Sequence, residues 1–165
     1  MNDRYFYVYL FVVVVSISFL GASCVQDNCN SVKCMNEGVC VNGGCACAYG
    51  YEGEFCEEQW YRKFEGEWSV SEKVRTTGVL RQYTVNAHYY RAVDSFIVVG
   101  FPSETDTVVC KRKAHKVFYM VSKRLSLTDS LIGGEARLND DASVTGLYSL
   151  YADTVETSVN IAWTR

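Results

Sequence analysis

The sequence lacks the motifs and the charge balance that mark several functional classes. It has one proline and two histidines among 165 residues, and its net charge is −3. A charge this small does not indicate a nucleic-acid-binding chain, which usually carries a strongly basic surface. No G-x-S-x-G, H-E-x-x-H or glycine-rich phosphate-binding motif is present. We therefore expect no enzymatic activity, no cofactor and no metal site.

The sequence also lacks sustained helical periodicity. No stretch carries apolar residues at the 3.6-residue spacing of a helix together with helix caps. Twelve tyrosines and a 14% share of aromatic residues instead favour β-strands, because aromatic side chains suit a half-buried pleated surface. Hydrophobic residues make up 48% of the chain, which is enough for a packed core and excludes wholesale disorder.

Charge and cysteine are distributed unevenly. Residues 24–58 contain six acidic residues and one basic residue, whereas residues 59–165 contain twelve acidic and fourteen basic residues. Six of the eight cysteines fall within 28 residues; they are Cys29, Cys34, Cys40, Cys45, Cys47 and Cys56. The change in composition predicts a domain boundary near residue 58. The crowded cysteines indicate disulfides and an oxidising compartment, provided that the N-terminus exports the chain.

The cysteine-rich segment 29–56 resembles the EGF-like family. That family ends in C-x-C, followed by a glycine and an aromatic residue, a second glycine and a final cysteine. The segment Cys45-Ala-Cys47-Ala-Tyr-Gly50-Tyr51-Glu-Gly53-Glu-Phe-Cys56 has this pattern throughout. The sequence alone does not choose among the possible pairings. The resemblance implies the disulfides Cys29–Cys40, Cys34–Cys45 and Cys47–Cys56.

The segment is too short to bury a stabilising core, so covalent loop closure must supply its stability. Zinc is disfavoured, because Cys45-x-Cys47 lacks the C-x2-C spacing and no histidine lies nearby. Calcium is disfavoured because residues 26–28 offer few carboxylates. Receptor-activating growth factors of the family have Arg before the last cysteine, where this chain has Phe55. A spacer or interaction module is therefore the expected role.

Residues 1–23 are predicted to form a signal peptide. Arg4 precedes an apolar run over residues 5–20, and the small residues Gly21, Ala22 and Ser23 follow. The alternative is an uncleaved anchor helix, for which the apolar run is short.

Cys24, directly after these small residues, resembles the lipidated cysteine of a bacterial lipobox. The other six cysteines of the region form a complete set without it, which leaves Cys24 for different chemistry. Several acyl chains on this residue would anchor the chain firmly in a membrane. The alternative is an unmodified Cys24, either paired with Cys110 or free. Val25 does not match the inner-membrane retention signal, so outer-membrane or cell-surface placement is expected.

Residues 59–165 are predicted to form an all-β domain. Large side chains recur at every second position in Tyr83-Thr-Val85-Asn-Ala87 and in Val159-Asn-Ile161-Ala-Trp163. The predicted strands are 66–75, 79–89, 95–101, 107–113, 116–123, 129–138, 142–152 and 154–163. The expected fold is mainly β: a small disulfide-rich EGF-like module followed by an antiparallel meander of about eight strands. The meander forms a barrel or a sandwich, and closure is preferred because it removes exposed edges.

Gly66-Glu-Trp68 on the first of these strands resembles the opening of lipocalin-type barrels. The resemblance implies that Trp68 plugs one end of a barrel and that a late arginine, Arg165, stacks across it. The alternative is that Trp68 is a core aromatic residue of a sandwich. An eight-stranded interior can hold side chains or one small ligand.

A few further residues could carry a site. His88 and His115 are expected on the surface, and Asp140-Asp141 in a solvated turn. Lys111-Arg-Lys113-Ala-His-Lys116 could meet an anionic glycan or lipid headgroups, or could form a solvated corner between strands. Cys110 is expected to be a small buried core residue.

Together with its N-terminus, the chain resembles small surface lipoproteins of the Bacteroidetes type. We expect a membrane-anchored binding protein for a small apolar ligand or a glycan, with an EGF-like spacer. The alternative is an adhesion protein that acts through protein contacts. A cavity of several hundred Å³ lined by Tyr, Phe and Val would favour an apolar ligand. A packed interior with an exposed aromatic patch would favour adhesion.

Overall fold

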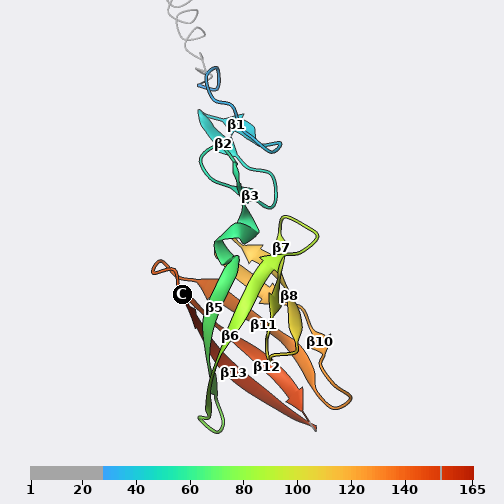
Figure 1. Cartoon of the computed structure of the whole chain (residues 1–165). Helices are drawn as coiled ribbons and strands as arrows, with labels where there is room; N and C mark the ends of the chain where they lie inside the picture. The colour runs from blue at the N-terminus through green and yellow to red at the C-terminus, as the bar shows by residue number, and fades with distance from the viewer. Residues whose placement is uncertain (1–27, 153) are drawn as a thin grey trace, which may run out of the picture.

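The computed structural model describes residues 28–152 and 154–165 (Figure 1). The predicted signal peptide at residues 1–23 and the predicted lipidation site Cys24 lie outside the described residues. Within the described ranges, no helix has both the length and the apolar character needed to cross a bilayer.

Three disulfides hold the N-terminal part of the described chain. They join Cys29 to Cys40, Cys34 to Cys45 and Cys47 to Cys56, which is the set that fits an EGF-like module. Between them, β1 (Val39–Val41) and β2 (Gly44–Ala46) form an antiparallel hairpin. Asn42 and Gly43 make its turn with positive φ angles of 52° and 87°, which asparagine and glycine tolerate better than other residues.

A short second hairpin leads from the module to the barrel. Strand β3 (Tyr51–Glu52) pairs with β4 (Glu58–Gln59), and the 3-10 helix η1 (Trp60–Phe64) follows directly. The Trp60 backbone N–H donates to the Gly50 carbonyl at 2.8 Å, which ties η1 to the last turn of the module. A side chain at Gly50 would collide with Val93 of the barrel, since its Cβ would lie 2.3 Å from Val93 Cγ2.

The rest of the chain is a closed antiparallel barrel of eight strands. Its strands are β5 (Gly66–Val74), β6 (Leu80–Tyr89), β7 (Ser95–Val99), β8 (Thr107–Ala114), β9 (Val117–Met120), β11 (Ser130–Leu138), β12 (Val144–Ala152) and β13 (Val155–Thr164). Neighbours in sequence pair with one another, β9 pairs with β11, and β13 pairs with β5 to close the ring. The two-residue strand β10 (Lys123–Arg124) pairs only with the start of β11.

The eight predicted strands are all present, and the barrel is the correct one of the two predicted architectures. The largest difference concerns the predicted strand 116–123, which the structure divides into β9 and β10. After Met120 the chain leaves the barrel wall, and Lys123 then pairs with Leu131 at the start of β11. The sequence pattern does not distinguish these two pairings, because both segments are extended.

Aromatic side chains fill the barrel at the end next to η1. Trp60 and Phe64 of η1 are fully buried. The Phe64 ring stacks on Phe96 at 4.9 Å between centroids and meets Phe118 edge-on at 5.1 Å. Trp163 lies 5.7 Å from Phe118 and 6.1 Å from Trp68. We call Trp60 and Phe64 the plug, because they cover this end of the barrel from the N-terminal side.

Trp68 and Arg165 adopt the arrangement that the lipocalin-type resemblance implies. The Trp68 side chain is buried, and its indole N–H donates to the Phe64 carbonyl at 2.7 Å. The Arg165 guanidinium lies 4.0 Å above the Trp68 ring and donates to the Glu65 carbonyl at 2.7 Å. A cation over an indole face is favourable, so the C-terminus is fixed at the plugged end.

Candidate binding site at the open end of the barrel

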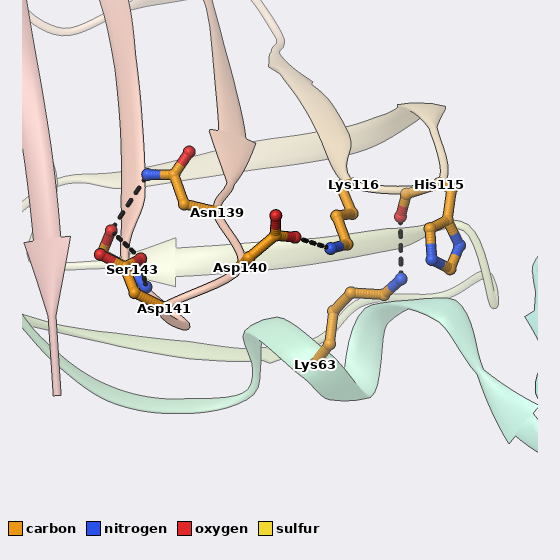
Figure 2. Close-up of polar contacts among 7 residues, drawn as sticks. All are labelled: Lys63, His115, Lys116, Asn139, Asp140, Asp141 and Ser143. Atoms are coloured by element: carbon orange, nitrogen blue, oxygen red, sulfur yellow. Dashed lines mark hydrogen bonds and ion pairs between the residues drawn. The ribbon is translucent and has the colours of Figure 1, made fainter.

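Several residues singled out in the sequence lie on the rim beside η1, at the plugged end (Figure 2). Lys63 of η1 donates to the His115 carbonyl at 2.8 Å, and Lys116 forms an ion pair with Asp140 at 2.5 Å. Hydrogen bonds from Ser143 hold Asp141 and lower the pKa of its carboxyl. The hydrogen bond and charge of Lys116 lower the pKa of Asp140. Asp140 and Asp141 are thus solvated turn residues, as expected.

Two of the four basic side chains in segment 111–116 form ion pairs with neighbouring carboxylates. Lys113 pairs with Glu135 and Lys116 with Asp140. Arg112 lies 5.1 Å above the Tyr49 ring of the EGF-like module, where it helps to join the two parts of the chain. These contacts favour the structural interpretation of the segment over a binding patch for anionic groups.

The remaining candidates do not assemble into a catalytic or metal site. His88 is exposed on β6, whereas His115 lies in the turn between β8 and β9, with its Nδ1 2.8 Å from Glu52 of the EGF-like module. Within residues 28–152 and 154–165, no three His, Cys, Asp or Glu side chains are grouped as metal ligands would be. Cys110 is buried on β8, and burial raises the pKa of its thiol, as befits a core residue.

A polar cluster that the sequence analysis did not identify lies toward the other end of the barrel. Trp68, Val70 and Glu72 follow one another at alternate positions of β5, and all three side chains are buried. Glu72 is therefore a carboxylate inside the barrel wall, with a relative exposure of 2%. An isolated charge there would be very costly, so its partners decide what the site can do.

Two phenols and one guanidinium surround Glu72. Tyr83 and Tyr148 both donate hydrogen bonds to Glu72 Oε1, the second at 2.7 Å. Arg81 Nη1 lies 3.9 Å from Glu72 Oε2, at the limit of an ion pair. Gly134 makes room for Tyr148, because a Cβ on Gly134 would lie 2.5 Å from the Tyr148 Cβ.

Arg81 connects this buried cluster with two surface pockets. We call this end of the barrel the mouth; it is formed by the β5–β6, β7–β8, β9–β11 and β12–β13 connections. One pocket has a volume of about 500 Å³, the other about 380 Å³, and Arg81, Ser103 and Thr105 line both. Arg81 is half exposed, and its Nη2 donates to the Pro102 carbonyl at 3.3 Å.

The second pocket has mixed walls. Its polar lining includes Asp106, Ser126 and Asp129, and its apolar lining includes Leu125, Leu150 and Tyr151. This is not the Tyr, Phe and Val lining expected for an apolar ligand. Hydroxyl groups, carboxylates and one guanidinium beside apolar surface instead suit a ligand that has both hydrogen-bonding edges and C–H faces.

The sequence did contain a signal for this site. A charged residue at the inward position after Trp68 and Val70 contradicts the hydrophobic alternation of β5, and such conflicts often mark functional positions. Its partners could not be found in the same way, because Tyr83 and Tyr148 lie 11 and 76 residues away.

No protein-family model matches the chain, and no curated protein is similar to it in sequence. The solved structures that resemble the chain include two that cover a little over 60% of it. The first is a redesigned β-barrel with 13% identity, a TM-score of 0.45 and coverage of 62% of this chain and 91% of that chain. The second is EF1p2_mFAP2b bound to DFHBI, with 13% identity, a TM-score of 0.49 and coverage of 63% and 94%.

The polar cluster predicts a loss of stability at alkaline pH. Burial, together with the Glu72 carboxylate, raises the pKa of Tyr83 and Tyr148 well above that of an ordinary phenol. In the unfolded chain both phenols ionise near about pH 10. Above that pH the unfolded state binds fewer protons than the folded state, so the free energy of unfolding falls as pH rises.

Replacing Tyr83 and Tyr148 by Phe should make this fall shallower by about 1.4 kcal/mol per pH unit for each phenol removed. Urea unfolding at several pH values on both sides of about pH 10 measures the slope. Tyr119→Phe, on an exposed position of β9, controls for the substitution itself. Equal slopes in the double variant and the wild type would show that the phenols do not hold their protons as the geometry requires.

Proposed function

We propose that this chain is an exported, lipid-anchored, non-enzymatic binding protein whose barrel binds a glycan unit at the mouth. The observation that supports it best is the asymmetry of the barrel. Aromatic residues fill the interior of the barrel beside the EGF-like module, whereas Arg81 joins two pockets at the opposite end to the buried Glu72 cluster. Pockets of about 380 and 270 Å³ also lie on the module side, but no residue that contacts the Glu72 carboxylate lines either of them. This difference supports a ligand site at the end remote from the module.

The EGF-like module fits the role of a spacer. Besides the Arg112–Tyr49 contact, Lys63 of η1 pairs with Glu52 at 2.5 Å and the Trp60 indole donates to the His115 carbonyl at 2.8 Å. These contacts join the module to the plugged end of the barrel. A tether at the N-terminus would therefore direct the mouth away from the membrane.

Export is supported by the disulfides, because such bonds persist in oxidising compartments. Lipidation of Cys24 is proposed from the sequence alone. A protein partner is the second candidate function, and exposed apolar side chains of the EGF-like module favour it. Met35, Val39 and Val41 are each more than half exposed there, at 56%, 65% and 55%. In that case the module, rather than the barrel mouth, would be the contact surface.

The glycan proposal predicts that a bulky side chain in the mouth abolishes binding. Thr105 is exposed and lines both pockets, so Thr105→Trp should fill them while leaving the core intact. Screening the purified, oxidised protein against an array of glycans measures the effect. Thr76→Trp is the matched control, because Thr76 is exposed in the β5–β6 connection and lines neither pocket.

Loss of glycan binding in Thr105→Trp but not in Thr76→Trp is the expected result. Glycan binding that survives Thr105→Trp would exclude the mouth as the site. Absence of glycan binding in the wild type, combined with capture of a protein by the EGF-like module, would favour the second candidate function.

The anchoring proposal predicts a specific mass for the mature protein. Intact-mass analysis of membrane-extracted protein should show a chain that begins at Cys24, carries acyl chains and has three disulfides. Cys24→Ser should move the protein to the soluble fraction, because under this proposal the lipid is its only membrane anchor and the variant cannot carry it. A membrane-extracted protein that still contains residues 1–23 would contradict lipidation and favour an anchor helix.

A further inference from the structure

We propose that the ligand at the mouth carries a carboxylate on a polyhydroxylated ring, as in a uronic acid, and that Arg81 binds this carboxylate. The inference rests on the proposed function and specifies the ligand class of the same site. It depends on the state of the Arg81 guanidinium, on the partners of the neighbouring carboxylates and on the lining of the second pocket.

The Arg81 guanidinium keeps free hydrogen-bonding capacity. Arginine has five N–H donors in a planar fork. The Arg81 guanidinium donates one hydrogen bond to the Pro102 carbonyl, approaches Glu72 to 3.9 Å and lies 5.8 Å from the centre of the Tyr83 ring. The side chain is half exposed and lines both pockets. A fork of this kind binds a carboxylate through two parallel hydrogen bonds.

Glu72 leaves Arg81 available, because the phenols share the task of stabilising its charge. Tyr83 and Tyr148 donate to the same carboxylate oxygen, Oε1. The guanidinium lies on the side of the other oxygen, at a distance longer than that of a tight ion pair. Glu72 thus orients Arg81 from inside the barrel, and the outer part of the guanidinium faces the pockets.

Apart from Arg81, the charged side chains that line the two pockets are acidic, and they limit which anions can bind. Asp106 accepts from Ser103 Oγ at 2.6 Å and lies 3.5 Å from Lys123 Nζ, so its charge is partly offset. Glu104 lines the first pocket and Asp129 the second. Asp129 repels a simple anion, whereas a ligand that also has hydroxyl groups can donate a hydrogen bond to Asp129.

The remaining lining fits a sugar ring. Ser126 and Thr105 offer hydroxyl groups, while Leu150 and Tyr151 offer apolar surface to the C–H face of a ring. The volume of about 380 Å³ is sufficient for one monosaccharide. A uronic acid combines a carboxylate for Arg81, hydroxyl donors for Asp129 and an apolar face, and the mouth supplies a partner for each.

Three sugars that share one ring separate this proposal from its alternatives. Glucuronate carries an anionic group, glucose is neutral and glucosamine carries a cationic group. The corresponding three sugars with the galactose ring test a second ring geometry. Amide chemical-shift changes in the oxidised full chain report both affinity and position. The uronates should bind most tightly and should shift signals of residues 81, 103–106, 125–129 and 150–152.

Arg81→Gln should weaken uronate binding by about tenfold or more, because a charge-assisted paired contact is lost. Arg81→Lys keeps the charge but loses the planar fork, so it should retain part of the affinity. This second variant keeps the test valid if Arg81→Gln does not fold. Arg75→Gln is the matched control, since Arg75 is exposed at the same end and lines neither pocket.

Each outcome decides between the two proposals. Tightest uronate binding that depends on Arg81 and not on Arg75 supports the carboxylate contact. The carboxylate contact is excluded if glucose binds as tightly as the uronates, if glucosamine binds more tightly, or if both Arg81 variants leave uronate binding unchanged. In each of these cases, chemical-shift changes at the mouth would still support the proposed function. If none of the sugars shifts mouth signals and the glycan array is also negative, both proposals fail.

Discussion

Trp60 and Phe64 enter the end of the barrel from the N-terminal side and pack against Phe96 and Phe118, with ring centroids about 5–6 Å apart. Fully burying an aromatic side chain of this size contributes on the order of 2 kcal/mol, so the plug is a large part of the core. It also fills the interior of the barrel at this end. The position of the candidate site at the opposite end follows from this packing.

The plug determines how the EGF-like module is attached as well. Only three residues separate the last disulfide cysteine, Cys56, from Trp60, so the chain between the cross-linked module and the buried plug is short. Glu52 of the module lies between Lys63 and His115, which belong to η1 and to the barrel rim. The small module is thereby held to the barrel by these ion pairs and by its short connection to the buried plug.

Local patterning was sufficient to predict most of the fold. Alternation placed Val85, Ala87, Val159, Ile161 and Trp163 on the inward face, and all five are buried. The choice between barrel and sandwich depended on the pairing of β9 with β11, which no local pattern encodes. The helix η1 was not predicted, because five residues are too few to show a helical period.

The candidate site was predicted less well than the fold. The sequence motifs point to His115, Lys116 and Asp140, which lie on the rim beside η1. The inward-facing Glu72 was visible in the sequence as an exception to the alternation of β5. The role of Glu72 depends on its partner Tyr148, which lies 76 residues further along the chain. The two residues become neighbours only when the barrel closes.

The barrel has one end closed by the plug and one accessible end, and hydrogen exchange of individual groups tests this directly. The Trp60 and Trp68 indole N–H groups donate to the carbonyl groups of His115 and Phe64 within the plugged end. Both should exchange only on global unfolding, whereas backbone amides of residues 103–106 and 126–129 at the mouth should exchange much faster. A Trp60 indole that exchanges as fast as the mouth amides would contradict the plug and, with it, the assignment of the binding site to the opposite end.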